Sequence, residues 1–272
     1  MAYEKLVRRA NPGLIVMILD DSGSMASNMP GTSDTRYQWV ERYSGIILKE
    51  LLERSMEVTG ETQTVKARYF LDVIKYGSTV EAWHTGPDGH GALDIGEAAR
   101  KFTDGGGSFG LKGGLGGTDA ASAFQFALSR VEKALQQDHF KDSFPPIVFH
   151  LTDGESHTDA EPIARQLMGL SSSDGNVLIV NGYIGTSTQL NYQGPNDFPG
   201  YLAEQEVGSS PDNLRLFRMS SAIPDSMREN LVNDGIFPAI RENVRLFFDV
   251  RTKEMLKHVI QVVGSGGSRL AR

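Results

Sequence analysis

One stretch near the N-terminus constrains the fold of this 272-residue chain more than any other. Six apolar residues run from Leu14 to Leu19 and are followed at once by Asp20, Ser22 and Ser24. A short apolar run that ends in a turn is typical of a strand buried on both faces. Because open α/β sheets bind ligands beyond the carboxyl ends of their strands, we expect the three polar side chains at the binding edge.

These three side chains offer oxygen atoms and no nitrogen or sulfur. Small, hard cations such as Mg²⁺ prefer that ligand set. The alternative is a strand-to-helix turn in which the same side chains cap backbone N–H groups. Taken alone, the stretch leaves both interpretations open.

Predicted strands and helices alternate along the rest of the chain. We expect strands at 14–19, 65–76, 147–151, 177–184, 214–219 and 244–250, and a short edge strand paired back at 80–83. We expect helices at 35–56, 95–102, 119–137, 159–170, 225–233, 236–243 and 253–263. This order predicts an α/β fold: a doubly wound, mostly parallel open sheet with helices on both faces and one short antiparallel edge strand.

The chain is predicted to be a single domain over residues 1–272, with a core at about 14–263 and short polar termini. Ser33 or Asp34 is expected to cap the first long helix. Residues 186–213 are polar and rich in Gly and Pro. A loop of that length is typical of a functional or mobile segment.

Composition excludes several classes of function. The chain has no cysteine, which excludes disulfides and thiolate metal sites. The net charge of −7 and the absence of a basic run argue against nucleic-acid binding. No apolar stretch is long enough to cross a bilayer, and no signal peptide is recognisable. We therefore expect a cytoplasmic protein with no membrane partner.

The element Asp20-Asp21-Ser22-Gly23-Ser24 resembles the D-x-S-x-S element of the von Willebrand factor A (vWA) domain family. That element opens the metal-ion-dependent adhesion site (MIDAS) of the family. The family also uses a Thr from a later loop and an Asp after a later strand. In this chain Thr118 follows Gly116-Gly117, and Asp153 follows the apolar run 147–151. The resemblance covers residues 14–263.

The resemblance implies a metal site and a mode of action. Ser22, Ser24 and Thr118 would supply neutral oxygens, and Asp20 and Asp153 would bind directly or through water. The expected cation is Mg²⁺, with Mn²⁺ or Ca²⁺ as alternatives. An open coordination position would bind a carboxylate of a partner protein, so the resemblance implies a binding module and no enzyme. In some relatives the C-terminal helix, residues 253–263 here, moves when the site is occupied.

Two further segments, 174–181 and 219–224, resemble bacterial stand-alone vWA proteins similar to the TerY-like group of tellurite-resistance and stress systems. Members of that group often accompany a PP2C-type phosphatase and a serine/threonine kinase-like protein. The resemblance implies a scaffold in such a signalling set.

Two other functions stay open. A metal-dependent phosphohydrolase of the haloacid dehalogenase type also has an Asp at the end of its first strand. Such enzymes usually have a second Asp two residues later, which acts as the general acid. In this chain Ser22 occupies that position, so the general acid is missing. A metal-free vWA-like scaffold would use Thr118 as a helix cap and Asp153 as a turn residue. The glycine-rich segment 105–117 lacks a P-loop pattern, because Gly113 follows Lys112, and is interpreted as a flexible loop that lets backbone approach the metal site.

Overall fold

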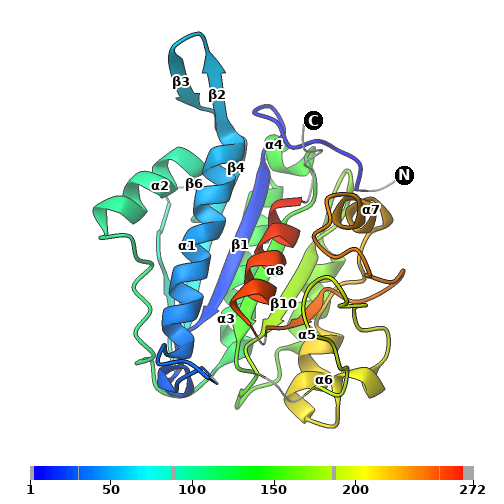
Figure 1. Cartoon of the computed structure of the whole chain (residues 1–272). Helices are drawn as coiled ribbons and strands as arrows, with labels where there is room; N and C mark the ends of the chain where they lie inside the picture. Colours follow the sequence, from blue (N-terminus) through cyan, green and yellow to red (C-terminus); the bar gives the residue numbers. More distant parts are fainter. Residues whose placement is uncertain (1–2, 30, 87–89, 186–187, 251, 266–272) are drawn as a thin grey trace.

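The computed structural model describes residues 3–29, 31–86, 90–185, 188–250 and 252–265. Its central layer is a sheet with the strand order β11-β10-β7-β1-β4-β5 (Figure 1). β1 (Gly13–Asp20) lies in the middle and pairs in parallel with β4 (Tyr69–Tyr76) and β7 (Ile147–Thr152). β10 (Leu178–Tyr183) and β11 (Phe247–Asp249) continue the parallel sheet on the β7 side.

Two short strands run against this direction. β5 (Val80–Ala82) and β6 (Leu93–Asp94) both pair with β4 in antiparallel fashion. The predicted fold class, including a short antiparallel edge strand at 80–83, is confirmed. A small separate hairpin joins β8 (Ser171–Ser172) to β9 (Gly175–Asn176).

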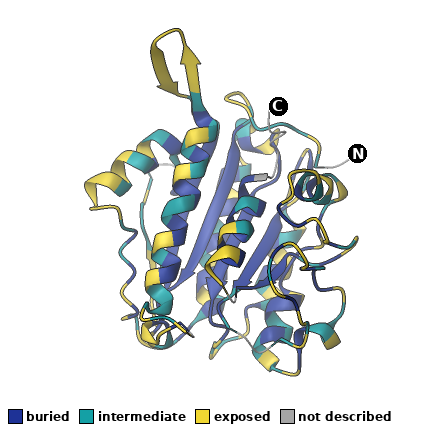
Figure 2. Ribbon diagram, viewed as in Figure 1, coloured by how far each residue is buried: buried dark blue, intermediate teal, exposed yellow. Residues whose placement is uncertain are grey.

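Helices cover both faces of the sheet. α1 (Arg36–Ser55) and α8 (Lys253–Ser265) lie on one face, and α3 (Ala120–Leu135) and α5 (Glu161–Gly169) lie on the other (Figure 1). The remaining helices are α2 (Ile95–Asp104), α4 (Asp138–Lys141), α6 (Pro211–Arg218), α7 (Asp225–Asn233) and the 3₁₀ turns η1 (Gly23–Ala26) and η2 (Glu204–Val207). The sheet itself is almost wholly buried (Figure 2).

The side chains of β1 alternate between two cores. Ile15, Met17 and Leu19 pack with α1 and α8, whereas Leu14, Val16 and Ile18 pack with α3 and α5. Successive strand residues point to opposite faces, so an unbroken apolar run is what a strand between two helical layers requires. Each such side chain contributes about 1.5–3 kcal/mol of burial.

The first long helix begins one residue later than expected, and its cap is a different residue. Thr35 is the N-cap: its hydroxyl accepts from the Gln38 N–H, and the Gln38 side chain accepts from the Thr35 N–H. Such a reciprocal capping box satisfies two N–H groups that the helix cannot pair. The expectation of Ser33 or Asp34 was wrong, and Asp34 instead pairs with Arg42.

Two predictions in the C-terminal half of the chain were wrong. Residues 214–218 belong to α6 and Met219 is its C-cap, because Pro211 in the first turn already has a φ suited to a helix. Residues 236–243 form turns rather than a helix. Gly235, at φ +67°, ends α7, and the buried ring of Phe237 then stacks on Phe248 with centroids 5.4 Å apart.

The predicted long loop is shorter than expected and is packed onto the core. Thr186 and Ser187 lie outside the described residues, and the loop ends where α6 begins at Pro211. Phe198 is fully buried, with its ring centroid 5.4 Å from that of Tyr201 and 4.8 Å from that of Tyr192. These aromatic contacts explain how a polar, glycine-rich segment is held in one conformation.

A hairpin projects beyond the C-terminal end of α1 (Figure 1). It consists of β2 (Met56–Thr59) and β3 (Thr62–Val65), so the predicted strand 65–76 is split and only Tyr69–Tyr76 joins the sheet. Val58 in this hairpin is 65% exposed. The hairpin lies at the end of the molecule opposite the carboxyl end of β1.

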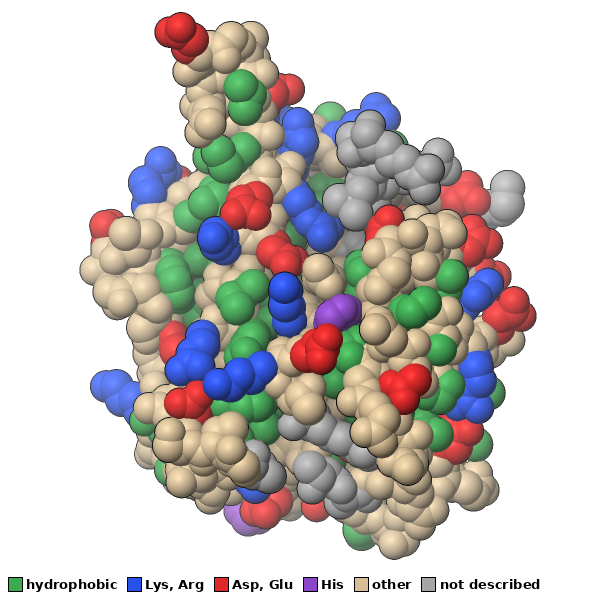
Figure 3. All heavy atoms as spheres, viewed as in Figure 1, with side chains coloured by type: hydrophobic (Ala, Val, Ile, Leu, Met, Phe, Trp, Pro, Cys, Tyr) green, Lys and Arg blue, Asp and Glu red, His purple; other side chains and the backbone are tan. Residues whose placement is uncertain are grey.

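The face covered by α1 and α8 carries side chains of both charge signs, interspersed with apolar ones (Figure 3). Asp34 is paired there with both Arg42 and Lys253, at 3.1 and 3.4 Å. Within the described ranges, no helix is long and apolar enough to cross a membrane.

Candidate metal centre

Three loops meet at the carboxyl edge of the sheet, below β1 in Figure 1. The Gly23 N–H, after β1, donates to the Gly116 carbonyl at 2.7 Å. The His157 N–H, after β7, donates to the Thr118 carbonyl at 3.0 Å. Backbone hydrogen bonds therefore fix the glycine-rich segment between the loops that carry Asp20 and Asp153.

Asp20 ends β1 with its side chain fully buried. Its Oδ1 accepts from the Ser22 N–H at 2.9 Å, and its Oδ2 accepts from the Thr152 hydroxyl at 2.6 Å. Burial raises the pKa of Asp20 to about 6, assisted by the negative charge of Asp153, although the hydrogen bonds from Ser22 and Thr152 oppose the shift. A cation here would relieve this unfavourable charge.

The hydroxyls of Ser22 and Ser24 lie 3.1 Å apart and hydrogen-bond to each other. Ser22 precedes η1 without capping it through its side chain. Asp119, not Thr118, caps α3 by accepting from the Ser122 N–H at 3.1 Å. The capping interpretation is therefore wrong for Ser22 and Thr118, and within the described residues the buried Thr118 hydroxyl makes no hydrogen bond.

Asp153 follows β7 and is also buried. Its Oδ1 accepts from the Glu155 N–H at 3.4 Å, as a turn residue would. Its Oδ2 accepts from Nη1 of Arg36 at 2.5 Å. Asp153 therefore has a charged partner that the sequence reasoning missed, because no pattern links the first residue of α1 to a strand end 117 residues away.

Asp21, the variable residue of the motif, is directed at the glycine-rich segment. It accepts from the N–H groups of Lys112, at 2.6 Å, and of Gly113. Burial raises the pKa of Asp21, and these hydrogen bonds oppose the shift. A Cβ on Gly77 would lie 2.4 Å from Cβ of Leu115, so the glycine-rich segment passes close to the turn after β4.

A buried polar chain lies beneath the site. The Tyr76 hydroxyl lies 2.8 Å from Nε2 of His150, and Nδ1 of His150 lies 2.8 Å from Oδ1 of Asn181. Nδ2 of Asn181 donates to Ser220, so its Oδ1 accepts from Nδ1–H of His150, and Nε2 accepts from Tyr76. Burial lowers the pKa of His150 to about 4, which keeps it neutral.

The sequence analysis did not predict this buried polar chain of side chains either. Its only signal was that His150 and Asn181 interrupt two otherwise apolar strands. The chain continues toward the metal centre, because the Tyr76 hydroxyl lies 3.4 Å from Oδ2 of Asp20.

The five expected ligands fit a hard divalent cation. They bring together two buried carboxylates and three hydroxyls from three loops, and all the donors are oxygen. In the part of the chain that the structure describes, no group of three or more His, Asp or Glu side chains could hold a metal ion. A metal at this edge would therefore depend on the hydroxyls as well as the carboxylates.

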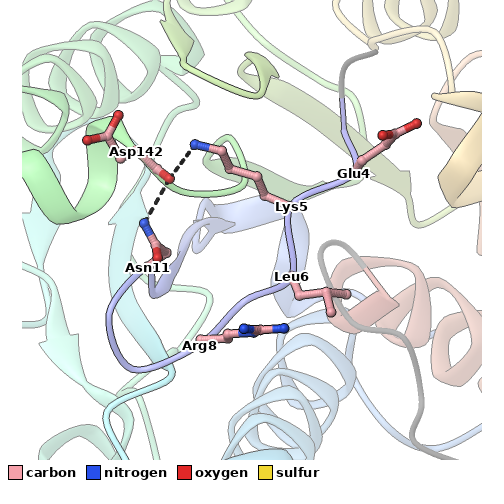
Figure 4. A pocket seen from close by; sticks show the side chains of 6 residues that line it. All are labelled: Glu4, Lys5, Leu6, Arg8, Asn11 and Asp142. Carbon is pink, nitrogen blue, oxygen red and sulfur yellow. Dashed lines mark hydrogen bonds between the residues drawn. The ribbon is translucent and has the colours of Figure 1, made fainter.

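A hollow lies at the opposite edge of the sheet, before β1. It is lined by Glu4, Lys5, Leu6, Arg8, Asn11 and Asp142 (Figure 4). Nζ of Lys5 and Nδ2 of Asn11 both donate to the Asp142 carbonyl, at 2.7 and 2.9 Å. These bonds attach the N-terminal segment to the turn after α4, so we assign this hollow a structural role.

Comparison with solved structures identifies the fold. Proximal thread matrix protein 1 (PTMP1) from the mussel byssus is 12% identical over 96% of this chain, with a TM-score of 0.52. The structure of the same protein with a zinc-occupied MIDAS motif is 12% identical over 96% of this chain, with a TM-score of 0.51. The structural neighbours are vWA domains. At this identity the likeness establishes the fold and nothing further.

This chain spans about half of the mussel protein, 47% and 48% in the two structures. The SpRpn10 VWA domain aligns with 96% of this chain and all of its own, at 9% identity and a TM-score of 0.47. No protein-family model matches the chain, and no curated protein sequence matches it.

Proposed function

We propose that this chain is a protein-interaction module that binds its partner through a divalent cation. The ligands are Asp20, Ser22, Ser24, Thr118 and Asp153. The observation that carries the proposal is their convergence from three separate loops onto one sheet edge, where the two carboxylates are buried. The cation is Mg²⁺, with Mn²⁺ or Ca²⁺ as alternatives, and the mussel protein with a zinc-occupied MIDAS motif supports a divalent ion in this fold.

A bound cation would supply positive charge and an open coordination position for a carboxylate of the partner. Residues of this protein would bind the cation and determine how much of its charge is neutralised. Neutral hydroxyls of Ser22, Ser24 and Thr118 leave much of the cation's charge uncompensated. Thr152 orients Asp20 through the 2.6 Å hydrogen bond to Oδ2. Such a site would attract acidic groups through the uncompensated charge of the cation.

An interaction module accounts for the site better than a phosphohydrolase. Acid–base catalysis at Asp20 would need a second proton-transferring group two residues on. Ser22 stands there, and its hydroxyl is engaged with Ser24 at 3.1 Å. A metal-free scaffold is the remaining alternative, in which the Arg36–Asp153 pair alone would neutralise the edge.

We further propose a setting, which rests on the resemblance of segments 174–181 and 219–224 to the TerY-like group. In that setting the module would act as a cytoplasmic scaffold of a signalling or tellurite-resistance-like system. Its partners would be a PP2C-type phosphatase and a kinase-like protein. Co-purification of those two proteins that is lost on adding a chelator tests this setting.

Calorimetric titration of metal-stripped protein with Mg²⁺ and Mn²⁺ tests the metal site. We expect saturable binding in the parent and none in Asp20→Asn. Asp234→Asn, which removes the same charge from an exposed position, serves as the matched control and should bind like the parent. Equal binding by Asp20→Asn and the parent would contradict the ligand set. Turnover of p-nitrophenyl phosphate with the same metal would favour the phosphohydrolase.

A further inference from the structure

Arg36 places a positive charge inside the candidate metal centre. It is the first residue of α1, and its Nη1 lies 2.5 Å from Oδ2 of Asp153. The side chain of Asp153 is 2% exposed and that of Arg36 is 25% exposed. Nε of Arg36 is buried and, among the described residues, has no hydrogen-bond partner.

The backbone of Arg36 is held independently of this ion pair. Its N–H donates to the Ser27 carbonyl at 2.9 Å, and Asn28 forms a β-bridge with Thr35. Thr35 also caps α1 through the reciprocal bonds with Gln38. The guanidinium can therefore leave Asp153 by side-chain rotation alone, while the loop after Ser24 stays in place.

Asp153 is the residue that a bound metal and Arg36 would both contact. A divalent cation draws on this carboxylate, either directly or through a water, whereas the guanidinium already holds its Oδ2. Two positive charges on one buried carboxylate repel each other at short range. The positive N-terminal end of α1 adds to this repulsion.

We propose that Arg36 is a resident cation that competes with the metal for Asp153 and thereby sets the metal affinity of the site. The inference rests on the proposed function. The ion pair neutralises Asp153 in the metal-free protein. Metal binding breaks this ion pair. The partner protein can therefore bind through a metal only above a free metal concentration that Arg36 determines.

Titration of the stripped protein with Mg²⁺ alone tests this competition. We expect Arg36→Gln to bind Mg²⁺ about tenfold more tightly than the parent, which corresponds to one charge-assisted hydrogen bond no longer broken. Arg42→Gln is the matched control, because Arg42 lies on the same helix and pairs with Asp34 instead. It should change the dissociation constant less than about twofold, since its charge is exposed and screened.

Thermal unfolding gives an independent readout. Without metal, Arg36→Gln should melt at a lower temperature than the parent, because Asp153 loses its buried counter-charge. With saturating Mg²⁺ that difference should shrink or reverse. If Arg36→Gln fails to fold, Arg36→Lys replaces it, since an ammonium keeps the charge but loses the planar fork, and it should tighten Mg²⁺ binding to a smaller extent.

The outcomes separate the two proposals. Binding of Mg²⁺ with equal or weaker affinity by Arg36→Gln than by the parent overturns the competition and leaves the metal site standing. No binding by the parent or any variant overturns both. A tightening in Arg42→Gln as large as in Arg36→Gln would assign the effect to net charge and overturn the specific role of Arg36.

Discussion

The hydroxyl of Thr152 donates a 2.6 Å hydrogen bond to Oδ2 of Asp20, so the last residue of β7 orients the carboxylate that ends β1. This bond crosses between neighbouring parallel strands at the edge where the candidate ligands gather. It also holds a carboxylate buried, although burial disfavours its charged form. The cation affinity that we propose for this site and the cost of burying Asp20 thus have the same origin.

Asp20→Asn should stabilise the metal-free protein at pH 8 while abolishing Mg²⁺ binding. The native pKa of Asp20, about 6, is raised above the ordinary 3.8, so its contribution to stability is present at low pH and lost as pH rises through 6. Removing the charge should recover about 3 kcal/mol at pH 8. Urea unfolding at pH 8 and pH 5 checks this, and an equal gain at both would contradict it.

His150→Gln should flatten the acid side of the stability profile. The native pKa of His150, about 4, lies below the ordinary 6.5, so its contribution is complete above pH 6.5 and lost as pH falls toward 4. The loss amounts to about 3 kcal/mol. Urea unfolding from pH 7 to pH 4 should show a shallower decline in the variant.

His150 and Asp20 act in opposite directions between about pH 4 and 6.5, so only single variants separate them. Parallel declines in the parent and His150→Gln would mean that the buried imidazole does not govern this range.

Gly77→Ala should weaken Mg²⁺ binding about tenfold. A Cβ at this position would meet Cβ and the carbonyl oxygen of Leu115 at 2.4 and 2.5 Å, and would push the segment leading to Thr118 away from β4. Such overpacking typically costs about 1–3 kcal/mol. Calorimetric titration should find Gly114→Ala unchanged, because a Cβ there meets only Lys112 at 4.0 Å. Equal losses in both variants would contradict this account.

Leu19→Asp should unfold the protein. Leu19 is fully buried in the central strand, and an unpaired carboxylate there should cost more than about 4 kcal/mol. Val58→Asp, in the projecting hairpin, should change stability by less than about 0.5 kcal/mol. Circular-dichroism melting compares the two, and a cooperative transition near the parent's temperature for Leu19→Asp would contradict the role of β1.

The sequence was most informative where one local rule dominates. The apolar run 14–19 is a strand between two helical layers, and its alternation feeds both cores. The prediction was wrong for 214–219 and 236–243, where short apolar patterns suit either helix or strand. There Pro211, Gly235 and the aromatic contacts around Phe237 decided the local structure.

The candidate site divides in the same way. The sequence by itself predicted that the candidate ligands follow or flank strand or helix ends; they are Asp20, Ser22, Ser24, Thr118 and Asp153. Because the carboxyl ends of parallel strands share one edge of a sheet, it also predicted that these residues lie together. The metal and partner assignments stay predictions.

Only the tertiary structure decided which groups surround those residues. Arg36 reaches Asp153, and Thr152 and Tyr76 reach Asp20, because parallel pairing and helix packing bring together segments 56 to 132 residues apart. Such pairings depend on strand register and on the direction of α1, which no local pattern encodes. The sequence predicted the candidate ligands, and packing determined the charge and the hydrogen bonds that surround them.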